Sequence, residues 1–163
     1  MKKLGFAFIL SILLVSTNLM FAQTKIATEH KTLEKPYNPE ENAQQKIDLL
    51  LKKAKKQNKF IILQAGGNWC SWCLLFNDFI KTNKLVKNEL NKNFLYYHLN
   101  YSKENKNEIV FAKYAPNGSK LGYPFFIVLD KQGKVVKLQE SGSLEQGKGY
   151  NENKVLAFLK SIK

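Results

Sequence analysis

The chain of 163 residues contains no arginine, only two cysteines and only two histidines, and each shortage excludes a class of protein. All 26 basic residues are lysines scattered along the chain, so the net charge of +13 arises without the arginine forks and single basic face that favour nucleic-acid recognition. We therefore expect a solvated basic surface and no nucleic-acid partner. Two cysteines are also too few for a disulfide-rich scaffold.

The first 22 residues are typical of a secretory signal. Two lysines precede an apolar run over residues 4–15, and a short segment with the predicted cleavage site follows and ends at Ala22. We predict cleavage after Ala22 and an exported protein, located in the periplasm or secreted. The alternative is an uncleaved anchor, although residues 4–22 are barely long enough to cross a bilayer and polar residues interrupt them.

The remaining chain is of a length that suits one domain with one core. We interpret residues 1–22 as the signal peptide, 23–41 as an N-terminal arm and helix start, and 42–163 as the domain. The polar, aperiodic part of the arm, residues 23–37, is expected to have little fixed structure. Asn38 is predicted to cap the first helix, with Pro39 at its first position.

Hydrophobic periodicity predicts strands that alternate with helices. Strands are expected at residues 60–63, 94–99, 125–129 and 134–138. Further helices are expected directly after the cysteines and at residues 83–91, 104–114 and 151–162. A turn at residues 130–133 joins the last two strands as a hairpin, and the apolar run 60–63 indicates a strand buried on both faces. This order predicts an α/β fold with a small mixed β-sheet flanked by helices.

Cys70 and Cys73 lie between the strand expected at 60–63 and the helix expected after it. The pair could form a metal site, a structural disulfide or a redox-active dithiol. A closed zinc site needs four ligands, and His30 and His98 have no partner at ligand spacing, so we expect no metal. An inert staple is also disfavoured, because a bridge between residues three apart closes almost no loop.

A working dithiol is the favoured use of Cys70 and Cys73. The start of a helix offers unpaired N–H groups and the positive end of its dipole, which stabilise a thiolate. Cys70 lies at this end and is the expected nucleophile. Cys73, one turn further, is expected to be buried and to resolve the mixed disulfide by attacking Cys70.

These features together resemble the thioredoxin superfamily over about residues 42–163. They are the strand at 60–63, the run Trp69-Cys70-Ser71-Trp72-Cys73, and Gly122-Tyr123-Pro124-Phe125 before a strand hairpin. The helical insert after the cysteines and the predicted export resemble periplasmic thiol–disulfide interchange proteins. The resemblance implies an oxidoreductase that reduces, exchanges or isomerises protein disulfides, needs no cofactor, and has a membrane electron-donor protein as its partner if it works as a reductase. The single cysteine pair makes a monomer the default.

The resemblance also implies roles for the residues around the cysteines. Tyr123–Pro124 would be a cis peptide facing the sulfurs, whose loop pairs with the substrate backbone, with Tyr123 at the substrate edge. The alternative is a trans proline that opens a strand. Trp69 would shape the active surface, and Trp72 would cover the sulfurs or bind substrate.

Two positions depart from the family pattern. Gln64, six positions before Cys70, stands where many thioredoxins carry a buried carboxylate that aids proton transfer. A neutral amide at this proton-relay position can hydrogen-bond or position water, but it cannot accept the proton. Ser71 and Trp72 replace the Gly-Pro of thioredoxin between the cysteines, and this dipeptide helps to tune the reduction potential.

A second class of function stays open at this point. A thioredoxin fold can also serve as a binding module or client scaffold whose Cys70–Cys73 pair is redox-idle. In that case the basic surface and the loop at residues 141–149 would do the binding. An oxidoreductase could in turn work as a reductase, an isomerase or an oxidase.

Overall fold

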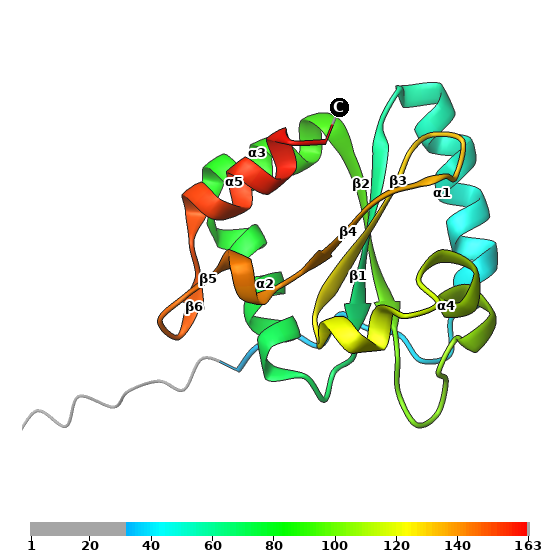
Figure 1. Ribbon diagram of the computed structural model, residues 1–163, viewed down its shortest axis with the longest axis horizontal. Helices are drawn as coiled ribbons and strands as arrows, with labels where there is room; N and C mark the ends of the chain where they lie inside the picture. The colour runs from blue at the N-terminus through cyan, green and yellow to red at the C-terminus, as the bar shows by residue number, and fades with distance from the viewer. Residues whose placement is uncertain (1–31, 163) are drawn as a thin grey trace, which may run out of the picture. The chain divides into compact units, whose positions relative to one another are not determined.

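The computed structural model describes residues 32–162 (Figure 1). The predicted signal peptide, its cleavage site and His30 lie outside the described residues. Within the described part, no helix combines the length and the apolar character needed to cross a membrane.

The elements alternate in the predicted order. The helices are α1 (Ala43–Gln57), α2 (Ser71–Thr82), α3 (Lys84–Asn93), α4 (Glu108–Tyr114) and α5 (Glu152–Lys160), with short 3-10 turns at Gly118–Leu121 and Gly142–Leu144. The strands are β1 (Phe60–Gly66), β2 (Phe94–Asn100), β3 (Phe125–Leu129), β4 (Val135–Glu140), β5 (Glu145–Gln146) and β6 (Gly149–Tyr150). The expected loop at 141–149 therefore contains a 3-10 turn and the start of a small two-stranded ribbon.

Four strands form one mixed sheet in the order β2-β1-β3-β4. β2 runs parallel to β1, whereas β3 is antiparallel to both of its neighbours, β1 and β4. Helices α1 and α4 lie on one side of the sheet, and α2, α3 and α5 on the other (Figure 1). The predicted α/β fold with a mixed sheet between helices is thus confirmed.

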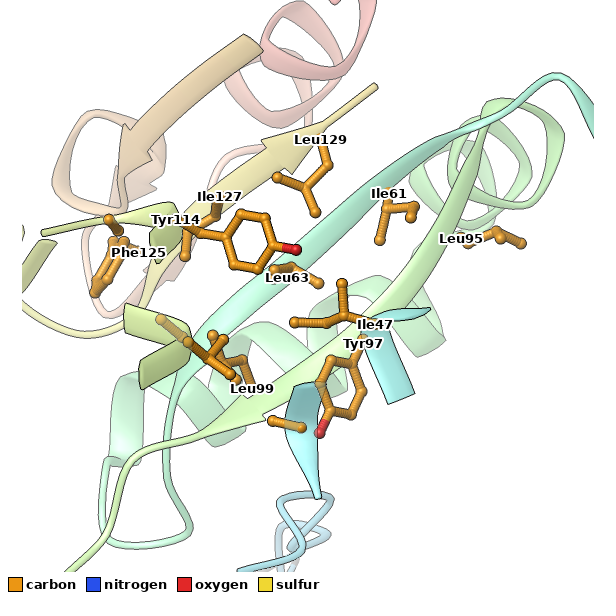
Figure 2. Packing of buried hydrophobic residues seen from close by; sticks show 14 of the residues in the cluster. Ile47, Ile61, Leu63, Leu95, Tyr97, Leu99, Tyr114, Phe125, Ile127 and Leu129 are labelled. Atoms are coloured by element: carbon orange, nitrogen blue, oxygen red, sulfur yellow. The ribbon is translucent and has the colours of Figure 1, made fainter. Parts of the chain in front are cut away.

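The central strand β1 contributes to both cores because its side chains alternate between the faces. Ile61 and Leu63 join the cluster under α1, where Figure 2 shows them packed with Ile47. Ile62 points to the other face and joins the cluster under α2, α3 and α5. This two-sided burial fixes the register of β1, and therefore the place where the chain leaves the sheet just before Cys70.

The first helix begins later than predicted. Asn38 does not cap it, because the side chain of Asn38 accepts a hydrogen bond from the backbone N–H of Glu40 at 2.9 Å and closes a local turn. Asn42 is the N-cap, and its side chain accepts from the backbone N–H of Gln45 at 3.0 Å. Residues 38–42 therefore belong to the arm, which continues along the domain surface before α1.

Candidate active site

The two cysteines meet at the beginning of α2, as predicted. Cys70 is the N-cap residue in an extended conformation, and its Sγ accepts a hydrogen bond from the backbone N–H of Cys73 at 3.1 Å. The sulfurs are joined in a disulfide, and the described residues contain no other cysteine. Cys70 retains 6% exposure whereas Cys73 has 0%, so Cys70 is the cysteine of the pair that is in contact with solvent.

This position favours a thiolate on Cys70 once the disulfide is reduced. The Cys73 N–H already points at the Cys70 sulfur, and the positive end of the α2 dipole acts in the same direction. Both effects stabilise the negative charge and lower the pKa of a thiol placed there. The geometry therefore supports the expected roles, in which Cys70 is the nucleophile and Cys73 is the buried cysteine.

The chain reaches the cysteines through Gly66 and Gly67, where side chains have no room. A Cβ on Gly66 would overlap the Cys73 sulfur and come within 2.9 Å of the Tyr37 hydroxyl. A Cβ on Gly67 would overlap the Trp69 indole and lie 2.7 Å from the Tyr101 carbonyl oxygen. Glycine is required here because the end of β1 passes directly beneath the disulfide.

The loop before β3 packs against the same cysteine pair. The Tyr123–Pro124 peptide bond is cis, as the resemblance implies, and Pro124 is buried. Tyr123 is partly buried and packs against the cluster that contains both cysteines. Its ring meets Trp69 edge-on, with centroids 5.4 Å apart, and stacks on Tyr101 at the same separation.

The two tryptophans take different positions. Trp69 is 59% exposed, and its indole N–H donates to the backbone carbonyl of Tyr101 at 2.7 Å, which holds the ring beside a cleft of about 530 Å³. Trp72 is half-buried and lies edge-on to Tyr150 of β6, whose hydroxyl donates to the Trp72 carbonyl at 3.2 Å. Trp69 is therefore the tryptophan that presents most of its surface to a partner.

Gln64 is fully buried and links β1 to the cysteine helix. Its amide N–H donates to the Cys73 carbonyl at 3.0 Å, and its amide oxygen accepts from the Tyr96 hydroxyl at 2.6 Å. Burial raises the pKa of Tyr96 well above its ordinary value, so this hydroxyl stays a donor. Gln64, which was expected at a proton-relay position, thus forms a structural bridge with no acidic group.

The site also contains Tyr37, which the sequence analysis placed in an arm with little fixed structure. Tyr37 is only 3% exposed and packs in one cluster with Cys70 and Cys73. Its backbone N–H donates to the Asn68 side chain at 3.1 Å, and its carbonyl accepts from the same side chain at 2.7 Å. A lone aromatic residue in a polar segment was the only sequence signal for this contact.

Behind the site lies His98 of β2, next to Gln64 in the sheet register. Its ring meets Tyr37 at 5.2 Å and Tyr96 at 5.3 Å. Burial, and secondarily the charge of Lys81, lower the pKa of His98 to about 4, so the ring is neutral near physiological pH. Residues 32–162 contain no group of three or more acidic, histidine or cysteine side chains placed to hold a metal ion.

Solved structures with the same fold include thiol–disulfide proteins. The disulphide isomerase from Xylella fastidiosa Temecula1 is 21% identical, with a TM-score of 0.69 over 80% of this chain and 98% of that one. A DsbH oxidoreductase is 23% identical, with a TM-score of 0.51 over 70% and 76% of the two chains. A redox protein from Chlamydomonas reinhardtii is 20% identical, with a TM-score of 0.50 over 73% of this chain and 33% of that one.

A search of curated protein sequences found no match. The family comparison, in contrast, matches the model of the thioredoxin-like domain over residues 47–148. This range covers more than half of the chain and includes β1, both cysteines, the cis-proline loop and the β3–β4 hairpin. The chain therefore belongs to the thioredoxin-like domain family.

Proposed function

We propose that the protein is an exported thiol–disulfide oxidoreductase that uses Cys70 and Cys73 to reduce, exchange or isomerise protein disulfides. One observation carries the proposal: the pair is bonded at the N-terminus of α2, with Cys70 accessible and Cys73 fully buried. Membership of the thioredoxin-like family supports the same class of activity. The predicted signal over residues 1–22 is the basis for export.

The reaction needs only the two cysteines and a substrate disulfide. The Cys70 thiolate attacks one substrate sulfur, a Cys70–substrate disulfide forms, and the other substrate sulfur leaves as a thiolate that takes up a proton. Cys73 then loses its proton and attacks the Cys70 sulfur, which releases the second substrate thiol. The pair is oxidised by two electrons, and the substrate disulfide is reduced by two electrons. No cofactor enters this sequence.

Substrate would bind over the surface formed by Trp69, Trp72, Tyr123 and Pro124. The exposed indole of Trp69 meets the ring of Tyr123 edge-on, and Tyr123 packs against the cluster that contains Cys70. Aromatic side chains supply large contact areas at low entropic cost, which suits extended peptide segments of differing sequence. The domain at residues 42–163 would act as a monomer, with the preceding arm completing the site.

The direction of electron flow depends on the partner. A reductase or isomerase would receive electrons from a membrane electron-donor protein, whereas an oxidase would need a partner that reoxidises the pair. The equilibrium reduction potential against glutathione separates the two. A value near about −270 mV indicates a reductase, and a value towards about −120 mV indicates an oxidant.

The activity is tested by two single substitutions assayed with a disulfide-bonded protein substrate. Cys70→Ser should abolish exchange. Cys73→Ser should still attack but should accumulate the Cys70–substrate disulfide, which denaturing electrophoresis without reductant detects. If neither wild type nor Cys73→Ser forms this species, the oxidoreductase proposal is wrong and the redox-idle binding module takes its place.

A further inference from the structure

Tyr37 lies outside the part of the chain that matches the family, yet its side chain packs against the disulfide. It precedes residues 47–148, and it lies in the arm that leads to α1. Its hydroxyl and the Cys73 sulfur approach the same point, the Cβ position of Gly66, and its ring packs in the cluster of both cysteines. The phenol is thus placed at the sulfur that solvent does not reach.

The Tyr37 hydroxyl is buried and makes no hydrogen bond of good geometry with any described residue. The Gln64 amide lies near enough to oppose the rise in the pKa of Tyr37, but both ends of that amide are already bonded, to Cys73 and Tyr96. A buried hydroxyl without a partner is costly, and such a group in a native structure needs an explanation. The Cys73 sulfur, which becomes free on reduction, is the neighbouring acceptor that the disulfide occupies.

We propose that the Tyr37 hydroxyl donates a hydrogen bond to the Cys73 sulfur in the reduced protein and so stabilises the Cys73 thiolate that resolves the mixed disulfide. This inference rests on the proposed oxidoreductase function. In the disulfide the sulfur is a weak acceptor, whereas a thiolate is an anion that accepts a strong, charge-assisted hydrogen bond. Tyr37 can make this hydrogen bond from the arm, whereas both polar ends of the Gln64 amide are already bonded to Cys73 and Tyr96.

The step is balanced without a proton passing through Tyr37. The Cys73 thiol gives its proton to the substrate thiolate set free when the mixed disulfide formed, and Tyr37 keeps its own proton while it donates to the new Cys73 thiolate. That thiolate then forms the bond to the Cys70 sulfur as the Cys70–substrate bond breaks. The hydrogen bond is strongest while Cys73 carries charge, so it lowers the pKa of that thiol.

The surroundings keep Tyr37 protonated over the working pH range. Burial, and next the neighbouring Tyr150, raise the pKa of Tyr37 well above its ordinary value. The polar and titratable groups that surround it come from five elements: Gln64 of β1, Cys70 and Cys73 at α2, Tyr96 and His98 of β2, Tyr150 of β6, and Asn68 of the loop after β1. His98 in turn is influenced by Lys81 and Glu34 and is neutral above about pH 4. Tyr37, Tyr96 and His98 therefore keep their neutral forms while Cys73 titrates.

Tyr37 is also held in place independently of its hydroxyl. Its backbone is bonded twice to Asn68, and its ring packs edge-on against His98. A Tyr37→Phe substitution should keep these contacts and remove one oxygen atom. Tyr96→Phe is the matched control, because it removes an equally buried hydroxyl that is bonded to Gln64 and not directed at a sulfur.

The experiment measures the pKa of the Cys73 thiol by thiolate ultraviolet absorbance in three proteins, each carrying Cys70→Ser. Tyr37→Phe should raise this pKa by about one unit, which corresponds to a tenfold smaller thiolate fraction at any pH below the pKa. Tyr96→Phe should raise the pKa clearly less. An unchanged pKa in Tyr37→Phe, or an equal rise in both variants, overturns the inference.

A kinetic measurement follows in proteins that retain both cysteines. Release of substrate from the Cys70–substrate disulfide should be about threefold slower in Tyr37→Phe near neutral pH, because the greater nucleophilicity of the less acidic thiol partly offsets the tenfold smaller thiolate fraction. This slowing should disappear above the Cys73 pKa. A difference that persists unchanged at high pH points to a packing defect and contradicts the hydrogen bond. If the wild-type pair does not exchange at all, the proposed function fails, whereas the thiol pKa in the Cys70→Ser proteins still decides the role of Tyr37.

Discussion

The side-chain amide of Gln64 donates a hydrogen bond of 3.0 Å to the backbone carbonyl of Cys73, so the central strand holds the buried cysteine through a neutral group. The other end of the amide accepts from the Tyr96 hydroxyl. Both of its polar atoms are therefore used, at a position with 0% exposure. A carboxyl group here would have to stay protonated in order to make the same two bonds.

Gln64→Glu tests this requirement through the pH dependence of stability. Burial should raise the pKa of the introduced carboxyl in the folded state above its unfolded value of about 4.3. Below about pH 4, the difference in stability between the variant and wild type should not depend on pH. Between the unfolded and the folded pKa, the variant should lose about 1.4 kcal/mol more for each pH unit. Urea unfolding from pH 4 to pH 8 measures the difference, and a constant offset across this range would refute the argument.

Gly66→Ala should destabilise the protein because the added methyl group would overlap the Cys73 sulfur and crowd the Tyr37 hydroxyl. We expect a loss of about 1–3 kcal/mol, the usual range for overpacking a filled core. Exchange of the disulfide with glutathione should slow as well, since the sulfur must move. Gly149→Ala is the control, because nothing lies within 4 Å of its Cβ position. Equal unfolding midpoints for the two variants would show that the site has room.

Asn68→Ala should release the arm from the active site. The substitution removes both hydrogen bonds to the Tyr37 backbone, at 3.1 and 2.7 Å, and should lower stability by about 1–3 kcal/mol. Amide hydrogen exchange should increase at Tyr37 while the sheet keeps its protection. Gln44→Ala removes an exposed bond to Asp48 and should leave both quantities nearly unchanged. Unaltered exchange at Tyr37 in Asn68→Ala would show that other contacts hold the arm.

His98 should make the fold sensitive to acid. Its pKa is lowered from 6.5 to about 4, so the unfolded chain binds a proton in this window that the folded protein excludes. Stability should fall as the pH drops from 6.5 to 4, by about 3 kcal/mol in total from this residue. His98→Gln should flatten the profile in that interval, while Lys81 and Glu34, the charges that act on the ring, remain. Parallel profiles for the two proteins between pH 4 and 6.5 would contradict the assignment.

The sequence by itself determined the fold and the reactive pair. The alternation of strands and helices, the run of apolar residues in β1, and two cysteines at a helix start are local patterns, because each depends on residues close together in the chain. β3, for example, has the predicted bounds, and the hairpin that follows it pairs as expected. The proline loop, in contrast, was predicted only through the resemblance of the chain to the thioredoxin superfamily.

Only the tertiary structure decided what surrounds the buried sulfur. The contact between Tyr37 and the cysteines joins the arm to α2, and the bridge from Gln64 to Tyr96 joins neighbouring strands. Neither pair has a characteristic spacing, since the sheet brings together residues that the sequence separates. The start of α1 was mispredicted for a related reason: Asn38 and Asn42 are both good caps, and the bonds that each side chain makes in the folded chain select Asn42.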